Sequence, residues 1–324
     1  MVKQEFWFRR VDLISWRILL EDFETAYRQI RAGQGIQLPT TTTPYTEWAA
    51  RLTSATSAGA LHAEVEYWAS PAGASVAPLP RDRAAQGNGT MNSAAVASAK
   101  LDPKETRILL EEIPAIYGVR INDVLLTALV RALSAWTGYN DFLIDIEGLG
   151  REPVFEGVDL WRTIGWFTPV YPVLLQAGGR EIADTLKSVQ RQLAGVPNHG
   201  VGYSALRYLS KSPEISARMR AIPTAEIAFL YQGRSALSFN DSSIVAALAK
   251  ESSGTAHSSN TQLSHLLSIN TAIVAGELCS DWIYSTQNYK RETIQTLAQS
   301  HLHALRSLVQ TSRSEKQAIV PVSV

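Results

Sequence analysis

The stretch that decides the fold runs from residue 141 to residue 175, DFLIDIEGLGREPVFEGVDLWRTIGWFTPVYPVLL. Residues 142–146 are apolar apart from one acid, so we expect a largely buried strand there. Glu147, Arg151 and Glu152 follow among glycines, which allow sharp turns and close approaches of the backbone. A rigid strand that delivers a carboxylate into a glycine-lined opening suits catalysis. A polar surface turn with paired Glu and Arg is the alternative, and residue types alone do not separate the two.

The composition is that of a globular protein with a large core, because 45% of the 324 residues are hydrophobic and 19% are charged. This length suits one large domain or two lobes. Thirty basic and 30 acidic residues cancel, so the net charge indicates neither a nucleic acid nor an anionic membrane as partner. The N-terminus has no secretory apolar segment and no apolar run could span a bilayer, so we expect a cytoplasmic protein.

The sequence lacks the common signatures of metal and nucleotide sites. It contains no HExxH, CxxC, GxGxxG or GxxxxGK motif, so we expect no metal and no bound nucleotide. The single Cys279 excludes an internal disulfide, and we expect it to be a buried, unreactive thiol. His199 in a loop is expected to be structural or exposed, and His265 before a strand is expected to be a core or edge residue whose hydrogen bonds are satisfied.

Apolar residues recur at helical spacing in six segments, and Asp102 followed by Pro103 indicates the start of a further helix. The six predicted helices cover residues 16–30, 46–55, 61–68, 121–136, 182–193 and 294–309. We expect a short strand at 227–230 and two strands within 263–283, with a turn near Gly276. This alternation of helices and strands favours a layered α/β fold.

Two segments are predicted to lack regular structure. Residues 70–95 are rich in Ala, Gly, Ser, Pro and Asn and are interpreted as an exposed, flexible connector. Residues 234–260 are polar and are interpreted as a mobile hairpin or loop. We therefore expect a first lobe and connector in residues 1–95 and a second lobe in residues 96–324.

Several motifs together resemble the epimerization branch of the condensation-domain superfamily of nonribosomal peptide synthetases. They are EGLGRE at 147–152, RTIGWFTPVYPV at 162–173, PNHGVGY at 197–203 and INDVLLTAL at 121–129. The resemblance covers roughly residues 11 to 310. It implies a chloramphenicol-acetyltransferase-like fold whose two lobes meet at a tunnel. A carrier protein's phosphopantetheine arm would bring an aminoacyl or peptidyl thioester into that tunnel, and the chain itself would bind no cofactor.

The chain departs from the family at its first-lobe signature, HHxxxDxxSWR. Asp12, Ser15, Trp16 and Arg17 match it, but the two histidine positions fall on Trp7 and Phe8. The resemblance therefore implies that most of the first lobe is missing, as in an N-terminally truncated gene product. Leu149 stands where the family has a histidine and Ala228 where it has an asparagine, although Gln232 matches.

These departures bear on the chemistry that the family carries out. Epimerization removes and returns the proton at Cα beside a thioester carbonyl, which requires an acid and a base with tuned pKa values. The resemblance implies that the family's second histidine and the Glu of its EGHGRE motif form this pair, so that only Glu147 remains here as a catalytic residue. The residues that it implies as tunnel or motif support are Asp12, Ser15, Trp16, Arg151, Trp166, Tyr171, Tyr203 and Gln232. Asp12 is expected to form a structural salt bridge, with Arg151 as the candidate partner.

Three functions stay open from the sequence. The chain could be an epimerization- or condensation-type enzyme with altered chemistry, in which Glu147 is assisted by Tyr203, Tyr171 or Asp12. It could be a non-catalytic scaffold that binds a carrier protein and pairs with another part of a synthetase. It could also be a truncated gene product. Because a two-lobe core would have lost one wall, we also predict self-association.

Overall fold

The computed structural model describes residues 11–70, 76–84, 87–234 and 258–319. Trp7, Phe8 and most of the predicted loop at 234–260 lie outside the described residues.

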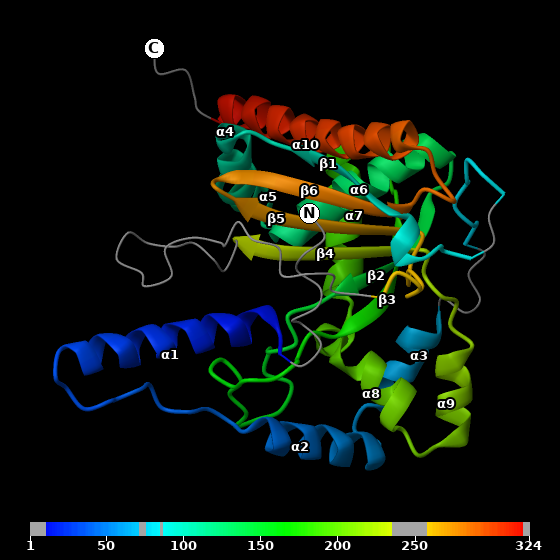
Figure 1. Cartoon of the computed structure of the whole chain (residues 1–324). Coiled ribbons are helices and arrows are strands. Elements are labelled where there is room, and N and C mark those ends of the chain that lie inside the picture. The colour runs from blue at the N-terminus through cyan, green and yellow to red at the C-terminus, as the bar shows by residue number, and fades with distance from the viewer. Residues whose placement is uncertain (1–10, 71–75, 85–86, 235–257, 320–324) are drawn as a thin grey trace.

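The described chain forms one mixed six-stranded sheet in the order β1-β6-β5-β4-β2-β3 (Figure 1). The strands are β1 (Ala94–Lys100), β2 (Asp141–Glu147), β3 (Val170–Gln176), β4 (Ile227–Arg234), β5 (Leu267–Val274) and β6 (Glu277–Ser285). β2, β4 and β5 run parallel to one another, and the other neighbours are antiparallel. The predicted α/β fold is therefore confirmed.

One face of the sheet is covered by long helices (Figure 1). They are α6 (Ile121–Thr137), α7 (Ile182–Ala194) and α10 (Arg291–Ile319). Apolar side chains on this face, such as Ile144 and Trp282, are fully buried. The opposite face, which we call the polar face, mixes polar with apolar side chains, and most of them are half-buried to exposed. Ser98 on β1 is bonded to Asp281 on β6 there, and Asn270 on β5 lies beside them. The sheet therefore buries one face against helices and presents the other with polar side chains.

The helices between residues 13 and 69 lie beside the sheet (Figure 1). These are α1 (Leu13–Arg31), α2 (Tyr45–Ser57), the short 3₁₀ helix η2 (His62–Glu64) and α3 (Val65–Ala69). A further group packs near the β3 edge: η6 (Pro197–Gly200), α8 (Val201–Leu209) and α9 (Pro213–Arg220). The predicted helices are thus present, and α9 was not predicted.

The helix that begins at Asp102 is confirmed together with its cap. The Asp102 side chain accepts from the Glu105 amide, the Glu105 side chain accepts from the Asp102 amide, and Pro103 is the first helical residue. The helix runs through α4 (Pro103–Arg107), a π-helical turn η5 (Ile108–Glu112) and α5 (Ile113–Tyr117). A short 3₁₀ helix, η4 (Met91–Ser93), precedes β1.

The predicted connector over residues 70–95 is mostly exposed between residues 76 and 84, but the described part is fixed to the fold at several points and ends in η4 and β1. Leu79 is only 6% exposed, and its amide donates to the Glu226 carboxylate at 2.6 Å. Asp82 accepts from the Lys290 amide at 2.8 Å. The composition of this segment, rich in Pro and Gly, therefore did not indicate that one apolar side chain and several polar groups attach it to the rest of the fold. The turn between β5 and β6 is at Ala275–Gly276, which confirms the predicted turn near Gly276, and both residues have positive φ, as a two-residue hairpin requires.

Within the described residues, no single helix combines the length and apolar character needed to cross a bilayer. One bent pair, Pro103–Tyr117 with Ile121–Thr137, passes that test by length and composition alone.

Candidate functional site

Asp12 begins α1 and occupies a buried position. Its carboxylate accepts from the Ser15 amide at 2.8 Å and from the Ser15 hydroxyl at 2.7 Å, so it caps the first turn of the helix. Ser15 also bonds Gly165, donating to its carbonyl at 2.9 Å and accepting from its amide at 3.0 Å. The start of α1 is therefore joined to the RTIGW segment.

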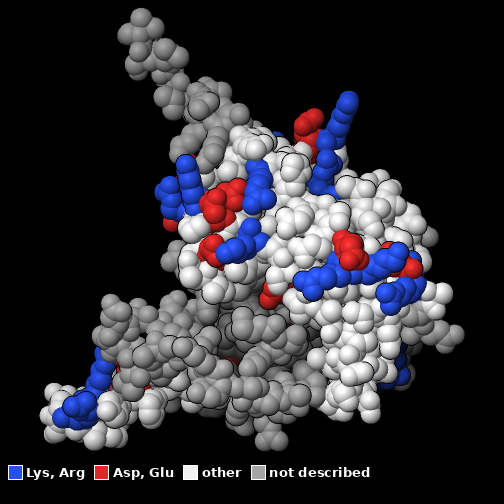
Figure 2. Space-filling view, turned by 45° about the horizontal axis from the view of Figure 1, so that its top comes forward, with Lys and Arg blue, Asp and Glu red and all other residues white. Residues whose placement is uncertain are grey.

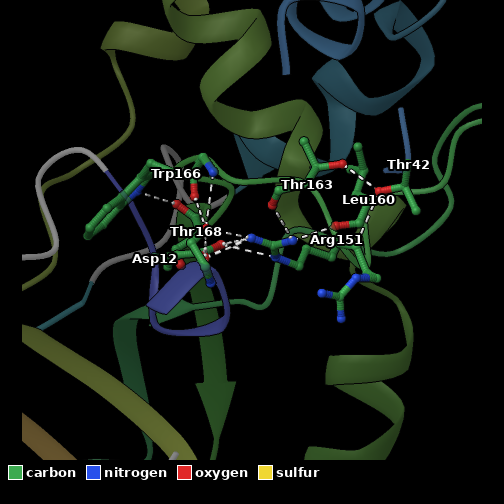
Figure 3. Close-up of polar contacts among 10 residues, drawn as sticks. Asp12, Thr42, Arg151, Leu160, Thr163, Trp166 and Thr168 are labelled. Atoms are coloured by element: carbon green, nitrogen blue, oxygen red, sulfur yellow. Dashed lines mark hydrogen bonds and ion pairs between the residues drawn. The ribbon is translucent and has the colours of Figure 1, made fainter. Parts of the chain in front are cut away.

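Arg151 forms the predicted salt bridge with Asp12, and the prediction is confirmed (Figure 3). Its Nη2 donates to Asp12 Oδ1 at 2.8 Å and its Nε to Oδ2 at 3.1 Å, while Nη1 donates to the carbonyls of Leu160 and of Thr163, the latter at 2.9 Å. The guanidinium is 2% exposed and lies 4.4 Å above the Phe167 ring. This buried ion pair is bidentate and has its remaining donors satisfied.

The loop between β2 and β3 is fixed around this pair. Gly150 has φ +72°, and a Cβ there would lie 1.8 Å from the Phe167 carbonyl, so only glycine fits. Thr163 bonds both the Thr42 hydroxyl and the Thr43 carbonyl, at 2.8 and 2.7 Å. The Asp12–Arg151 pair and its neighbours therefore hold three distant segments together, which we call the interlock.

Glu147 is the last residue of β2 and is half-buried. Asp145 aligns with Ala228 on β4, which aligns with Ser268 on β5, so all three lie on the polar face of the sheet. Glu147 follows Asp145 by two residues and shares that face. The Gly148 amide then donates to the Pro169 carbonyl at 2.9 Å, which closes the strand end. A rigid strand thus presents this carboxylate on the face that the long helices leave uncovered.

Tyr171 and Tyr203 are brought together by Trp68 in α3. Their ring centroids lie 5.9 and 5.4 Å from that of Trp68. Burial, with a smaller effect from Glu152, raises the pKa of Tyr171 to about 12. Burial also raises the pKa of Tyr203. Both phenols are therefore protonated at neutral pH, so neither can act as a base there, and the raised pKa also makes each of them a weaker acid.

A second buried carboxylate, which the sequence analysis missed, lies next to this aromatic cluster. Glu64 is 7% exposed and accepts from Trp68 Nε1 at 2.8 Å and from Asn198 Nδ2 at 2.6 Å. The four-residue spacing between Glu64 and Trp68 was the one local signal. Asn198 is 134 residues away from Glu64 in the sequence, and no local sequence pattern indicates the hydrogen bond between them.

His265 is satisfied by hydrogen bonds, as predicted. Its Nε2 lies 2.8 Å from Asp145 Oδ2 and its Nδ1 lies 3.0 Å from the Ser264 hydroxyl. His265 precedes β5 and Asp145 is on β2, so the side chain spans β4, where the residue aligned with Asp145 is the small Ala228. His199 is exposed, and Cys279 is half-buried with its thiol pKa raised by burial.

The remaining predicted support residues occupy separate elements. Trp16 is half-buried on α1, directly after Ser15. Trp166 is half-buried, and its Nε1 donates to the Thr168 carbonyl at 3.2 Å (Figure 3). Gln232 lies near the end of β4. The structure therefore joins Asp12, Ser15 and Arg151 in one cluster and Tyr171 with Tyr203 in another.

Figure 2 shows basic and acidic side chains interspersed over the visible face, without a patch of either sign. Among the described residues, no group of three or more His, Cys, Asp or Glu side chains could hold a metal ion.

Comparison with known sequences places this architecture in a large family. A family model described as "Condensation domain" matches residues 11–323. A linear gramicidin synthase protein from Brevibacillus parabrevis is 38% identical over 309 residues, which are 95% of this chain and 4% of that protein. Chondramide synthase cmdD from Chondromyces crocatus is 36% identical over 305 residues, which are 93% of this chain and 8% of that protein. The chain therefore spans a small fraction of the length of these relatives.

Comparison with solved structures agrees with the family match from the sequence comparisons. The epimerization domain from the third module of tyrocidine synthetase B has a TM-score of 0.85 and 32% identity, covering 94% of this chain and 68% of that chain. The condensation domain of the Monacolin K polyketide synthase MokA has a TM-score of 0.64 at 16% identity, over 94% of this chain and 68% of that chain, and this likeness shows the fold alone.

Proposed function

Because this chain belongs to the condensation-domain family of nonribosomal peptide synthetases, we propose that it binds an aminoacyl or peptidyl thioester presented by a carrier protein. In this proposal the phosphopantetheine arm is part of the substrate, and the chain itself holds no cofactor. Glu147 is the acid–base group that faces the carbon next to the thioester carbonyl.

The interlock is the observation that supports this proposal most. Arg151 is four residues after Glu147, and its bonds to Asp12, Leu160 and Thr163 fix the loop that follows β2. A carboxylate at the end of a strand and before a fixed loop keeps one position, which acid–base chemistry requires. The EGLGRE and DLISWR motifs, which match the family, are the two segments that this ion pair joins.

The proposal excludes efficient unaided epimerization. Inverting Cα requires breaking its C–H bond on one face, with the electron pair delocalised into the thioester, and delivering a proton on the other face. Glu147 can serve one face. Trp7 and Phe8, which stand at the family's histidine positions, cannot transfer a proton, and the raised pKa values of Tyr171 and Tyr203 exclude them as bases near neutral pH.

A binding experiment tests this proposal. A carrier protein bearing a non-hydrolysable aminoacyl-pantetheine amide is compared with the same carrier bearing unloaded pantetheine, by fluorescence anisotropy. We expect the chain to prefer the loaded carrier and Glu147→Gln to change that preference, because Glu147 faces the aminoacyl group. The control is Glu156→Gln, an exposed acid in the β2–β3 loop. Equal affinity for both carriers would contradict the proposal.

Deuterium exchange tests the catalytic part separately. With a thioester-loaded carrier in D₂O, we expect no deuterium at Cα beyond the uncatalysed rate. Rapid incorporation with inversion at Cα, read from the chirality of the released amino acid and removed by Glu147→Gln, would show that the chain epimerizes unaided.

A scaffold that pairs with another part of a synthetase is the second candidate. The exposed apolar side chains of α1, Phe23 at 58% and Ile30 at 59%, favour it. A scaffold alone would bind loaded and unloaded carriers equally, so the anisotropy experiment separates the two functions.

A further inference from the structure

We propose that Glu64 is a positioning residue of the thioester site. Through Asn198 it holds the turn formed by residues 198–200 against the glycine that follows Glu147. This inference rests on the proposed function, because it assigns the turn a part in holding the strand end that presents Glu147 to the thioester.

Glu64 is held by two neutral donors in a buried setting. Trp68 Nε1 and Asn198 Nδ2 are its hydrogen-bond partners, at 2.8 and 2.6 Å, and in the described part of the chain no basic side chain pairs with it. A buried carboxylate with only neutral partners is costly for stability. Gly202 makes room for it, since a Cβ at that position would lie 2.0 Å from Glu64 Oε2. The surrounding fold is thus built to accommodate this acid.

The turn that Glu64 holds is conformationally strained. Asn198 and His199 have φ values of 43° and 51°, and Gly200 follows with 88°. L-residues rarely adopt this left-handed region, and two consecutive non-glycine residues there are unfavourable. Such strain persists only where surrounding contacts impose it, and it is concentrated at functional sites. A side-chain hydrogen bond from Asn198 to Glu64 ties this turn to the end of η2.

The same turn lies against the strand end that carries Glu147. A Cβ at Gly148 would meet the His199 carbonyl at 3.4 Å and Tyr171 at 3.2 Å. A Cβ at Gly200 would lie 1.9 Å from the Tyr171 ring. The turn, Tyr171 and Gly148 therefore pack closely together, and the packing leaves no room for a side chain at Gly200 and little at Gly148. Tyr171 aligns with Ile146 on the helix-covered face, so the turn supports the strand end from the face opposite to Glu147. If the bond to Glu64 is lost, the strained turn can relax away from Gly148, and the backbone that carries Glu147 loses this support.

A donor–acceptor exchange tests this inference. Asn198→Asp places two carboxylates face to face, whereas adding Glu64→Gln restores a donor opposite an acceptor. We expect Asn198→Asp to reduce the preference for the loaded carrier about fivefold, which is the effect of losing one hydrogen bond. We expect the double variant to recover it to within about twofold. All affinities are measured well below the melting temperature of each variant.

His199→Gly is the matched control, because it removes strain from the turn and leaves the bond between Asn198 and Glu64 in place. We expect a higher melting temperature with the carrier preference unchanged. Asn198→Gly is the converse variant, because it keeps the left-handed conformation without the bond. We expect it to lose the preference while remaining folded.

The failure of this inference is distinguishable from that of the proposed function. If the wild-type chain prefers the loaded carrier in a Glu147-dependent way but Asn198→Asp and Asn198→Gly leave that preference intact, Glu64 is merely structural and the inference is overturned. If the wild-type chain shows no preference, the proposed function fails, and the inference fails with it.

Discussion

His301 shows how a single buried side chain ties the stability of this protein to pH. It lies in the core on α10, 5.8 Å from the Trp282 ring, with its Nε2 3.2 Å from the Leu125 carbonyl. Burial lowers its pKa from 6.5 to about 4. Between those values the unfolded chain binds a proton that the folded chain does not, so stability is complete above pH 6.5 and falls as the pH drops toward 4.

The test is the pH dependence of unfolding in His301→Leu. The difference of about 2.5 pKa units corresponds to roughly 3 kcal/mol, so the wild-type chain should lose up to that much between pH 6.5 and 4. The variant should lack this part of the loss. His303→Leu, at an exposed position on the same helix, is the control and should behave like wild type. Identical pH profiles for wild type and His301→Leu would refute the assignment.

At the scale of elements, α1 depends on the interlock for its attachment. Asp12 caps the helix and neutralises Arg151 at once, and removing it would leave a buried guanidinium uncompensated. We expect Asp12→Ala to destabilise the protein by about 3–5 kcal/mol in urea unfolding. Arg17→Ala breaks an exposed ion pair on the same helix and should cost less than about 1 kcal/mol. A cost for Asp12→Ala as small as that of Arg17→Ala would contradict the role of the interlock.

The elements also show what a sequence can reveal. The strand at Asp141–Glu147 and the helix cap at Asp102 follow from local patterns, and the pairing of Asp12 with Arg151 was anticipated from charge and motif. α9 was missed because its eight residues carry few apolar side chains, although Ser212 before Pro213 is a helix-start signal. The contact between Glu64 and Asn198 could not be predicted, because it depends on two segments that only the folded chain brings together.

At the scale of the whole molecule, α1 exposes an apolar stripe beside the sheet. Leu19, Phe23, Tyr27 and Ile30 recur at helical spacing and are 40–59% exposed. Exposed apolar stripes of this kind promote association. We expect Phe23→Glu to reduce concentration-dependent self-association in sedimentation velocity, and Thr25→Glu, on another side of α1, to leave it unchanged. A wild-type chain that is monomeric at every concentration would disprove this prediction.

The molecule as a whole thus combines a polar sheet face, a fixed carboxylate and a strained turn next to it. The measurement that tests this account most directly is the affinity of the chain for a carrier protein with and without a non-hydrolysable aminoacyl group. We predict tighter binding of the loaded carrier, with a preference that Glu147→Gln alters and Glu156→Gln does not. Equal binding of both carriers, or a preference for the loaded carrier that Glu147→Gln leaves unchanged, would contradict the central claim.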